Sequence, residues 1–434
     1  MDTSEKRKLL AKLLAKKNKI SVTEKSDVVD GSVASSRNMS LKEGIADLKK
    51  SFAKLKLIRQ ESPIYRSFEG MMKPILLREG QEVINFSGYD YLGFASDQRV
   101  QDAAIEAIKT MGTSVSASRI ASGQRPLHSE LEKEIADLFG VEDALVMVGG
   151  YSTNQTVISH IVGKDDLIIH DALMHRSAID GAMCSGAKRL AFPHNDLGVL
   201  ENILIENRKD FRQCLILIEG IYSVDGDLPD LARIIELKKR HDCFLFVDEA
   251  HSLGVLGVTG KGIGEHAGIN PKDVDFWMAT LSKSFASCGG AIAGKADVIE
   301  YLRYTTPGFV YSVGITPANA AAALKSIQLL KDEPQRATKV KENGRYFYDR
   351  LVQNGLNTGL SEGYNIVPVV VGNSLKTIKL SNALLDNDIN TQAFFYPAVA
   401  ENEARLRFFV TAEHTKEQLS QSADIIAKLY KKLF

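Results

Sequence analysis

One lysine stands at the end of an apolar run in the segment TLSKSFASCGG, residues 280–290. Hydroxyl side chains lie beside this residue, Lys283, at Thr280 and Ser282, and small residues follow it. The common explanation is an ordinary lysine in a surface loop. The alternative is a lysine that bonds covalently to the carbonyl group of a cofactor, because a desolvated amine is a good nucleophile.

A carboxylate and a histidine close another apolar run in the segment VDEAH, residues 247–251. A cofactor built on a pyridine ring needs a carboxylate that keeps the ring nitrogen protonated, and Asp248 could supply it. Asp248 precedes Lys283 by 35 residues, and both follow apolar runs, so they can lie at neighbouring strand ends. A metal site is less well supported, because no further pair of spaced ligands accompanies Asp248 and His251. The sequence has no GxSxG motif, which argues against a serine hydrolase.

Three further segments could bind a ligand. GGYSTNQ, residues 149–155, could open a helix whose N–H groups bind phosphate, although an ordinary strand-to-helix turn has the same pattern. HDALMHRS, residues 170–177, carries two histidines, for which a structural role is the usual explanation. The glycine-rich residues 254–268 fit neither a P-loop nor a dinucleotide fingerprint, since Val255 and Gly262 stand at required positions. We interpret them as a flexible loop.

The composition is that of an ordinary globular chain. Its 434 residues suffice for two or three domains, or for one large domain with a smaller appendage. The 54 basic residues balance the 54 acidic ones, so there is no general attraction to nucleic acid or anionic membrane. The four cysteines form no CxxC pair, and no stretch reaches the roughly 18 apolar residues of a membrane span. We expect a cytoplasmic protein without a metal.

Short apolar runs alternate with longer helical patterns. The helix expected at residues 232–241 lies between two expected strands. This alternation predicts an α/β fold, with a mostly parallel sheet flanked by helices and a small C-terminal α+β domain. The expected strands of the large domain are residues 144–148, 166–171, 214–220, 243–251 and 275–283. Asp248, Glu219, His170 and Lys283 stand at or just after the ends of these runs, where parallel sheets bind ligands.

The chain divides into four segments of different character. Residues 1–40 are expected to hold a basic amphipathic helix at residues 6–17, for docking or linking, followed by a flexible polar linker. A frayed basic tail is an equally good interpretation of this helix. We place an N-terminal segment at residues 41–95, a large cofactor-binding domain at 96–335 and the small domain at 336–434.

From about residue 60 to 425 these motifs together resemble the α-oxoamine synthase family of pyridoxal-phosphate enzymes. In that family TxxKxxG carries the Schiff-base lysine, here Lys283, and its threonine, here Thr280, binds the phosphate. VDEAH supplies the aspartate at the pyridine nitrogen, here Asp248, and a histidine near the ring oxygen, here His251. The resemblance implies bound pyridoxal 5'-phosphate and the aspartate-aminotransferase-like fold type I, with a seven-stranded-type sheet.

The same resemblance implies further contacts with the cofactor. EGIYSVDGD is similar to the family's EGxxSMDGD, whose serine, here Ser223, bonds the ring hydroxyl. The family's phosphate turn GxxxN corresponds to Gly150, Tyr151 and Asn154, and its ring-stacking histidine corresponds to His175.

The substrate residues are also implied by the resemblance. An arginine of the family's RLRxxxxxxH holds the carboxylate of an amino acid, and RLRFFVTAEH offers Arg405 and Arg407, of which we choose Arg407. Tyr89 stands in SGYDYLG where the family usually has asparagine. Ala398 stands where the family has a threonine in the acyl-thioester region. The choice of amino acid and acyl group is therefore left open.

The resemblance implies a decarboxylative condensation in a homodimer whose active sites form between subunits. A small amino acid (alanine, glycine or serine) loses its α-proton to Lys283 while Asp248 keeps the pyridine protonated. The carbanion attacks an acyl thioester, whose carbonyl His175 could polarise, carbon dioxide leaves and an α-amino ketone forms. An aminotransferase, an aldolase or a simple decarboxylase is a rival outcome of the same cofactor.

Two segments are most similar to a subgroup attached to polyketide synthase assembly lines. They are SVSASR, residues 114–119, and SVGITP, residues 312–317, which stands for the phosphate segment of the second subunit. The main interpretation is a synthase of polyketide-type biosynthesis, with docking to a polyketide synthase and an acyl donor carried by acyl carrier protein or coenzyme A. The alternative is a stand-alone 8-amino-7-oxononanoate synthase or serine palmitoyltransferase-like enzyme that uses acyl-CoA. A non-catalytic scaffold is the second alternative.

Overall fold

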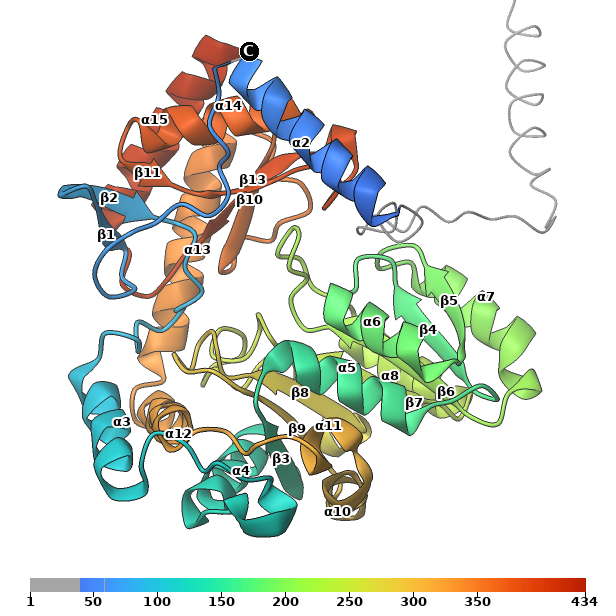
Figure 1. Ribbon diagram of the computed structural model, residues 1–434. Coiled ribbons are helices and arrows are strands. Elements are labelled where there is room, and N and C mark those ends of the chain that lie inside the picture. Colours follow the sequence, from blue (N-terminus) through green and yellow to red (C-terminus); the bar gives the residue numbers. More distant parts are fainter. Residues whose placement is uncertain (1–39, 58) are drawn as a thin grey trace, which may run out of the picture.

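Seven short strands form the central sheet of the large domain, in a computed structural model that describes residues 40–57 and 59–434 (Figure 1). Their order is β3-β9-β8-β7-β6-β4-β5, and β9 alone among the seven runs antiparallel to its neighbours. This mostly parallel sheet confirms the predicted fold class. The strands are β3 (Asp143–Met147), β4 (Leu167–Asp171), β5 (Lys188–Phe192), β6 (Cys214–Glu219), β7 (Phe244–Asp248), β8 (Phe276–Thr280) and β9 (Gly290–Gly294).

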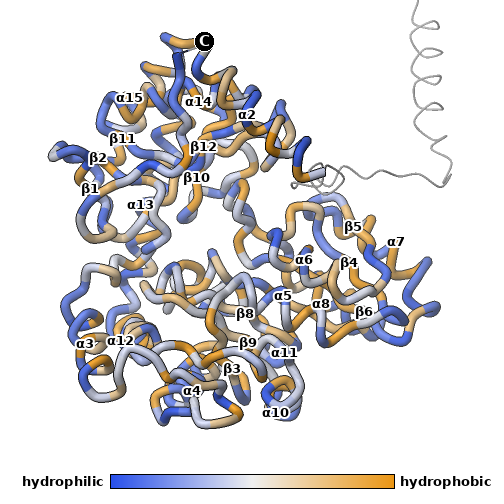
Figure 2. The backbone as a smooth tube through the Cα atoms, in the orientation of Figure 1, coloured by the Kyte–Doolittle hydropathy of each residue, from blue (hydrophilic) through white to orange (hydrophobic). Residues whose placement is uncertain are grey.

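Both faces of this sheet are covered by helices. Leu145 and Met147 of β3 belong to one buried cluster, and Ala144 and Val146 belong to the other, as the two-residue period of a strand requires. The first face is covered by α5 (Gly150–Ile161), α6 (Arg176–Ser185), α10 (Ala296–Thr305) and α11 (Pro307–Val310). The second is covered by α4 (Pro126–Phe139), α7 (Leu197–Asn207), α8 (Leu231–Arg240) and α12 (Pro317–Asp332), with α3 (Gln98–Met111) packed on α12. In Figure 2 the hydrophobic segments concentrate in the interior of this domain.

The small domain contains an antiparallel sheet in the order β10-β13-β12. The chain before the large domain joins it, because β2 pairs with β1 and, in parallel, with β11. Phe86 lies in the core of this domain, 5.2 Å from Phe347 and 5.4 Å from Phe408 between ring centroids. The strands are β1 (Ile75–Arg78), β2 (Gln81–Asn85), β10 (Ile366–Val370), β11 (Ile389–Asn390), β12 (Gln392–Phe394) and β13 (Arg405–Phe409), and the helices are α13 (Gln335–Gln353), α14 (Ser374–Leu385) and α15 (Lys416–Leu433).

Several short elements and one exposed helix complete the described chain. The helix α2 (Leu41–Leu57) leads into the N-terminal segment, whereas the helix and linker expected before residue 40 lie outside the described residues. The short elements are α9 (Ile263–His266), η2 (Arg119–Gly123), η3 (Arg208–Asp210), η4 (Pro271–Asp273) and η5 (Glu401–Glu403). Within residues 40–57 and 59–434 no helix is long and apolar enough to span a membrane.

The glycine-rich segment at residues 254–268 is an internally bonded loop. Its backbone N–H groups at Thr259 and Lys261 donate to the carboxylate of Glu265. The N–H of Ile263 donates to the buried Glu249, whose burial raises the pKa of its carboxyl to about 7. Because carboxylates of the chain itself accept from these amides, the loop is not built to hold a phosphate.

Candidate active site

Neighbouring strands bring Lys283 and Asp248 to the same edge of the large sheet. Asp248 ends β7 and is buried, and Lys283 follows the adjacent strand β8 by three residues. The Lys283 Nζ lies 2.9 Å from Nε2 of His251, and the hydroxyl of Tyr91 lies 2.7 Å from Nδ1 of the same ring. Lys283 therefore belongs to a bonded cluster rather than to a surface loop.

The charges in this cluster depend on burial. Burial lowers the pKa of Lys283 to about 8, although the nearby carboxylates of Asp248 and Glu219 oppose the change. Burial, together with the positive charges of Lys283 and Arg407, lowers the pKa of His251 well below its usual value. His251 is therefore neutral near pH 7 and accepts a hydrogen bond at Nε2 from the Lys283 ammonium, while its Nδ1–H donates to the Tyr91 oxygen.

A chain of hydrogen bonds connects Asp248 to His175. The amide nitrogen of Asn154 donates to Oδ2 of Asp248 at 2.7 Å and contacts the hydroxyl of Ser177 at 2.8 Å. The same hydroxyl lies 2.7 Å from Nδ1 of His175, which also accepts from the Ser177 N–H as the N-cap of α6. Burial lowers the pKa of His175, against the attraction of Asp248. Asn154 thus sets the orientation of Asp248, and Ser177 sets that of the His175 ring.

The N-terminus of α5 lies next to the end of β8. A Cβ atom added at Gly150 would lie only 2.7 Å from Oγ1 of Thr280, so glycine permits the close approach. Thr280 also contacts the hydroxyl of Ser282 at 2.8 Å. The first N–H groups of a helix have no partner within the helix and attract anions. Tyr151, the next residue of α5, bonds through its hydroxyl to Asp180.

These groups fit pyridoxal phosphate. A lysine of lowered pKa can bond to its carbonyl, a buried carboxylate can hold its pyridine nitrogen, and a helix N-terminus with a hydroxyl beside it can bind its phosphate. The buried Oδ1 of Asn154 and Oε1 of Glu219 have no hydrogen-bond partner among the described residues, so a polar ligand in the site could bond to them. No cluster of metal ligands occurs in the described part of the chain.

The structure distinguishes the two arginines of β13. Arg405 forms an ion pair with the buried Asp225. Arg407 has no carboxylate within ion-pair distance in residues 59–434; its Nη1 donates to the carbonyl oxygen of Ser223 at 2.6 Å and its Nη2 to Oε1 of Gln392 at 2.8 Å. Its guanidinium carbon lies 4.1 Å from the centre of the Phe394 ring. Arg407 is therefore the cation that remains available to a carboxylate ligand.

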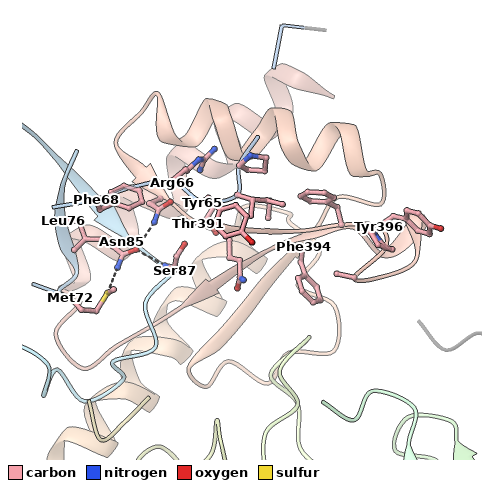
Figure 3. Close-up of a pocket in the computed structure, with 18 residues that line it drawn as sticks. Tyr65, Arg66, Phe68, Met72, Leu76, Asn85, Ser87, Thr391, Phe394 and Tyr396 are labelled. Carbon is pink, nitrogen blue, oxygen red and sulfur yellow. Dashed lines mark hydrogen bonds between the residues drawn. The ribbon is translucent and has the colours of Figure 1, made fainter. Parts of the chain in front are cut away.

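Tyr89 lies beside the Lys283 amine, and Ala398 lines a cavity. The centre of the Tyr89 ring is 5.8 Å from Nζ of Lys283, so the ring limits the space beside the amine. Ala398 lines a cavity of about 480 Å³ between residues 63–87 and residues 390–398. Figure 3 shows aromatic and aliphatic side chains around it, with Phe68, Met72 and Leu76 toward one end and Phe394 and Tyr396 toward the other.

Sequence reasoning missed several partners of the site. The contacts of Tyr91 with His251 and of Gln392 with Arg407 join segments that no motif connects. Glu219 is buried at the end of β6, and burial, reinforced by Asp248, raises its pKa well above the usual value. The sequence placed Glu219 at a strand end and Tyr91 within SGYDYLG without assigning a contact to either residue, whereas no signal marked Gln392.

Comparison with known proteins finds a matching family and several similar proteins. The family described as aminotransferase class I and II matches residues 81–426. The 8-amino-7-oxononanoate synthase of Symbiobacterium thermophilum is 38% identical over 377 residues, which are 86% of this chain and 96% of that protein. The corresponding synthase 1 of Bacillus subtilis is 37% identical over 85% of this chain and 93% of its own. A serine palmitoyltransferase from S. paucimobilis, solved with PLP and myriocin bound, superposes with a TM-score of 0.87 at 27% identity and covers 91% of this chain and 99% of its own.

Proposed function

The chain belongs to the aminotransferase class I and II family, as a pyridoxal-phosphate-dependent, acyl-transferring relative of the α-oxoamine synthases, and we propose that it joins a small amino acid to an acyl thioester with loss of carbon dioxide. The observation that carries this proposal is that one site contains both an amine that loses its proton easily and a cation that is free to bind a carboxylate. Lys283 has an amine of lowered pKa, and Arg407 is a buried guanidinium without a carboxylate partner among the described residues.

In this proposal different residues interact with different parts of the cofactor. When bound, pyridoxal phosphate supplies a carbonyl that bonds to amines and a protonated ring that accepts an electron pair. Asp248, oriented by Asn154, keeps the pyridine nitrogen protonated. Lys283 would hold the cofactor through its amine and would take the α-proton of the amino acid, for which a pKa of about 8 is well matched.

The other proposed contacts surround the ring and the phosphate. His175, held in orientation by Ser177, would cover the ring and could polarise the thioester carbonyl. Ser223 and His251 would hold the ring hydroxyl. Thr280 and the N–H groups of Gly150 and Tyr151 would bind the phosphate.

The amino acid binds with its carboxylate on Arg407. Burial lowers the pKa of this guanidinium, and a bound carboxylate would favour its positively charged form. The Tyr89 ring beside Lys283 favours a small side chain, as in alanine, glycine or serine. We assign the acyl chain to the cavity beside Ala398, because it reaches Gln392 and Phe394, which both contact Arg407.

The names of the relatives favour a stand-alone synthase that uses acyl-CoA over a role in polyketide assembly. A direct comparison of donors tests this. We expect acyl-CoA to support turnover in the full chain and in a variant that lacks residues 1–40. A strong preference for a carrier-bound acyl group that is lost in the truncated variant would instead support docking to a synthase.

The proposed activity is tested by titrating single amino acids into the cofactor-bound protein while its visible absorbance is recorded. We expect a change with one or two small amino acids, and release of carbon dioxide and free thiol once an acyl thioester is added. Lys283→Ala should show neither. Release of carbon dioxide without thiol would indicate a simple decarboxylase, and a protein that fails to bind pyridoxal phosphate would support the scaffold alternative.

We also propose a homodimer. Val313 is 47% exposed in residues 312–317, the segment that the resemblance assigns to the phosphate of the second subunit, and Tyr311, directly before that segment, is 87% exposed. Ile120, 52% exposed, lies close by, because Ser118 and Val313 form an antiparallel bridge. Neighbouring exposed apolar side chains of this kind are typical of a surface that another chain covers.

A further inference from the structure

The loop at residues 220–228 is held by both domains. It carries Ser223, whose backbone N–H donates to Glu219 and whose carbonyl oxygen accepts from Arg407. From the small domain, Arg405 pairs with Asp225, two residues further along the loop. Ser223 therefore sits in a segment whose position depends on contacts at both of its ends.

On the large-domain side the contact is made by His194. Its Nδ1 lies 2.9 Å from Oδ1 of Asp171, at the end of β4, and its Nε2 lies 2.7 Å from Oδ2 of Asp227, in the loop. Both carboxylates are buried. A neutral imidazole can donate from one nitrogen only, so two carboxylate partners require a doubly protonated ring. Burial alone would lower the pKa of His194, but the hydrogen bonds to the two carboxylates raise it to about 10.

The surroundings of His194 fix this bridge further. The Tyr222 ring packs edge-on against the imidazole at 4.5 Å between centroids. Asn195, in the left-handed region at φ 55°, donates from its backbone to Asp171 and from its side chain to Asp227 and to the carbonyl of Leu228. Asparagine tolerates this backbone conformation better than most residues. The bridge is therefore supported by further hydrogen bonds both at Asp171 and at Asp227.

We propose that His194 is a positioning residue that bridges Asp171 and Asp227 and so fixes the 220–228 loop, the Ser223 side chain and the carbonyl that holds Arg407. The proposal rests on the proposed function in one respect, namely that Ser223 contacts the bound cofactor. Loss of the bridge leaves the side chain of Asn195 to hold Asp227, so the loop is held less firmly and Ser223 and Arg407 are less well placed. Neither His194 nor residues 220–228 line the cavity beside Ala398.

The test is a set of three variants: His194→Gln, Ser223→Ala and the double variant. We expect His194→Gln to weaken pyridoxal-phosphate binding about tenfold, which corresponds to ~1.4 kcal/mol, and to shift the absorbance of the bound cofactor as Ser223→Ala does. The double variant should bind about as weakly as His194→Gln alone. Fully additive losses would overturn the proposal, because His194 would then act on the cofactor by another route.

Two controls separate positioning from general stability. His241→Gln changes a histidine at the C-cap of α8, beyond the opposite end of β7, and should leave cofactor affinity unchanged. His194→Gln should raise the dissociation constant of the amino acid about tenfold and leave the KM for the acyl thioester within about twofold. An equal loss for both substrates would contradict the proposal.

A second variant serves if His194→Gln does not fold. Asp227→Asn keeps the shape of the loop and an acceptor oxygen but removes one charge, and should weaken cofactor binding about threefold. Unchanged affinity in folded Asp227→Asn would overturn the proposal. The readings of cofactor affinity remain valid if the wild-type protein binds pyridoxal phosphate but condenses no amino acid with a thioester.

Discussion

The amine of Lys283 and the imidazole of His251 are hydrogen-bonded at 2.9 Å, and each carries a lowered pKa. Because two positive charges at this distance repel one another, at most one of the two groups is protonated near neutral pH. Lys283 keeps its proton with the help of Asp248 and Glu219, and His251 stays neutral. The pair therefore carries a single positive charge, which lies on Lys283, next to the position of the cofactor.

This arrangement predicts how cofactor attachment depends on pH. Only the neutral amine attacks a carbonyl, and the pKa of Lys283 is about 8 rather than the ordinary 10.5. The rate at which the cofactor-free protein bonds covalently to pyridoxal phosphate should rise with pH, with a midpoint near 8, and level off above it. Absorbance at a series of pH values measures this rate. A midpoint near 10.5 would contradict the prediction, and Lys283→Ala is the control.

The same shift has a consequence for stability. Between pH 8 and 10.5 the unfolded chain holds the Lys283 proton more than the folded chain does. The contribution of this residue to the free energy of unfolding should therefore rise with pH through that window, because stability increases where the unfolded state binds more protons. Below pH 8 the amine is protonated in both states and its contribution no longer changes.

Replacing Arg407 by alanine should weaken amino-acid binding, whereas replacing Arg405 by alanine should lower the stability of the fold. Arg407→Ala removes the proposed carboxylate anchor and should raise the dissociation constant of the amino acid about 100-fold, or ~2.7 kcal/mol. Arg405→Ala leaves Asp225 buried without its cation and should lower the free energy of unfolding by about 3–5 kcal/mol. Spectral titration and denaturant unfolding distinguish the two. Equal effects of both variants on amino-acid binding would contradict the assignment.

The strand ends explain how much of the site the sequence could predict. Lys283, Asp248 and Glu219 follow apolar runs of a parallel sheet, so their meeting at one edge follows from topology. The strands β5 and β9 were not predicted. β9 has the sequence GAIAG, with little of the β-branched and aromatic content that marks a strand.

The remaining contacts depend on tertiary packing. Asn154 and Asp248 are 94 residues apart in sequence, and Ser223 and Arg407 are 184 apart. No local pattern encodes which amide faces which carboxylate. The resemblance could identify Asn154, but not its bond to Asp248, and it could offer two arginines without the ion pair that occupies one of them.

The cavity beside Ala398 should determine the length of the acyl chain. Ala398→Phe adds a ring to a space of about 480 Å³ and should lower kcat/KM for long acyl-CoA substrates about tenfold relative to short ones. A series of thioesters of increasing chain length measures this. Ala400 is two residues further along and does not line the cavity, so Ala400→Phe is the matched control. An unchanged chain-length profile in Ala398→Phe would show that the acyl group binds elsewhere.

The exposed segment around Val313 should form the dimer interface. Val313→Asp places a charge where an apolar contact is expected, and desolvating an unpaired carboxylate is costly, so the dimer should dissociate. Cofactor affinity should fall with it, because the resemblance assigns this segment to the phosphate of the partner. Light scattering and a pyridoxal-phosphate titration measure the two effects. Val352→Asp changes a valine of similar exposure on α13 and should alter neither; a Val313→Asp protein that remains dimeric with full cofactor affinity would contradict the interface.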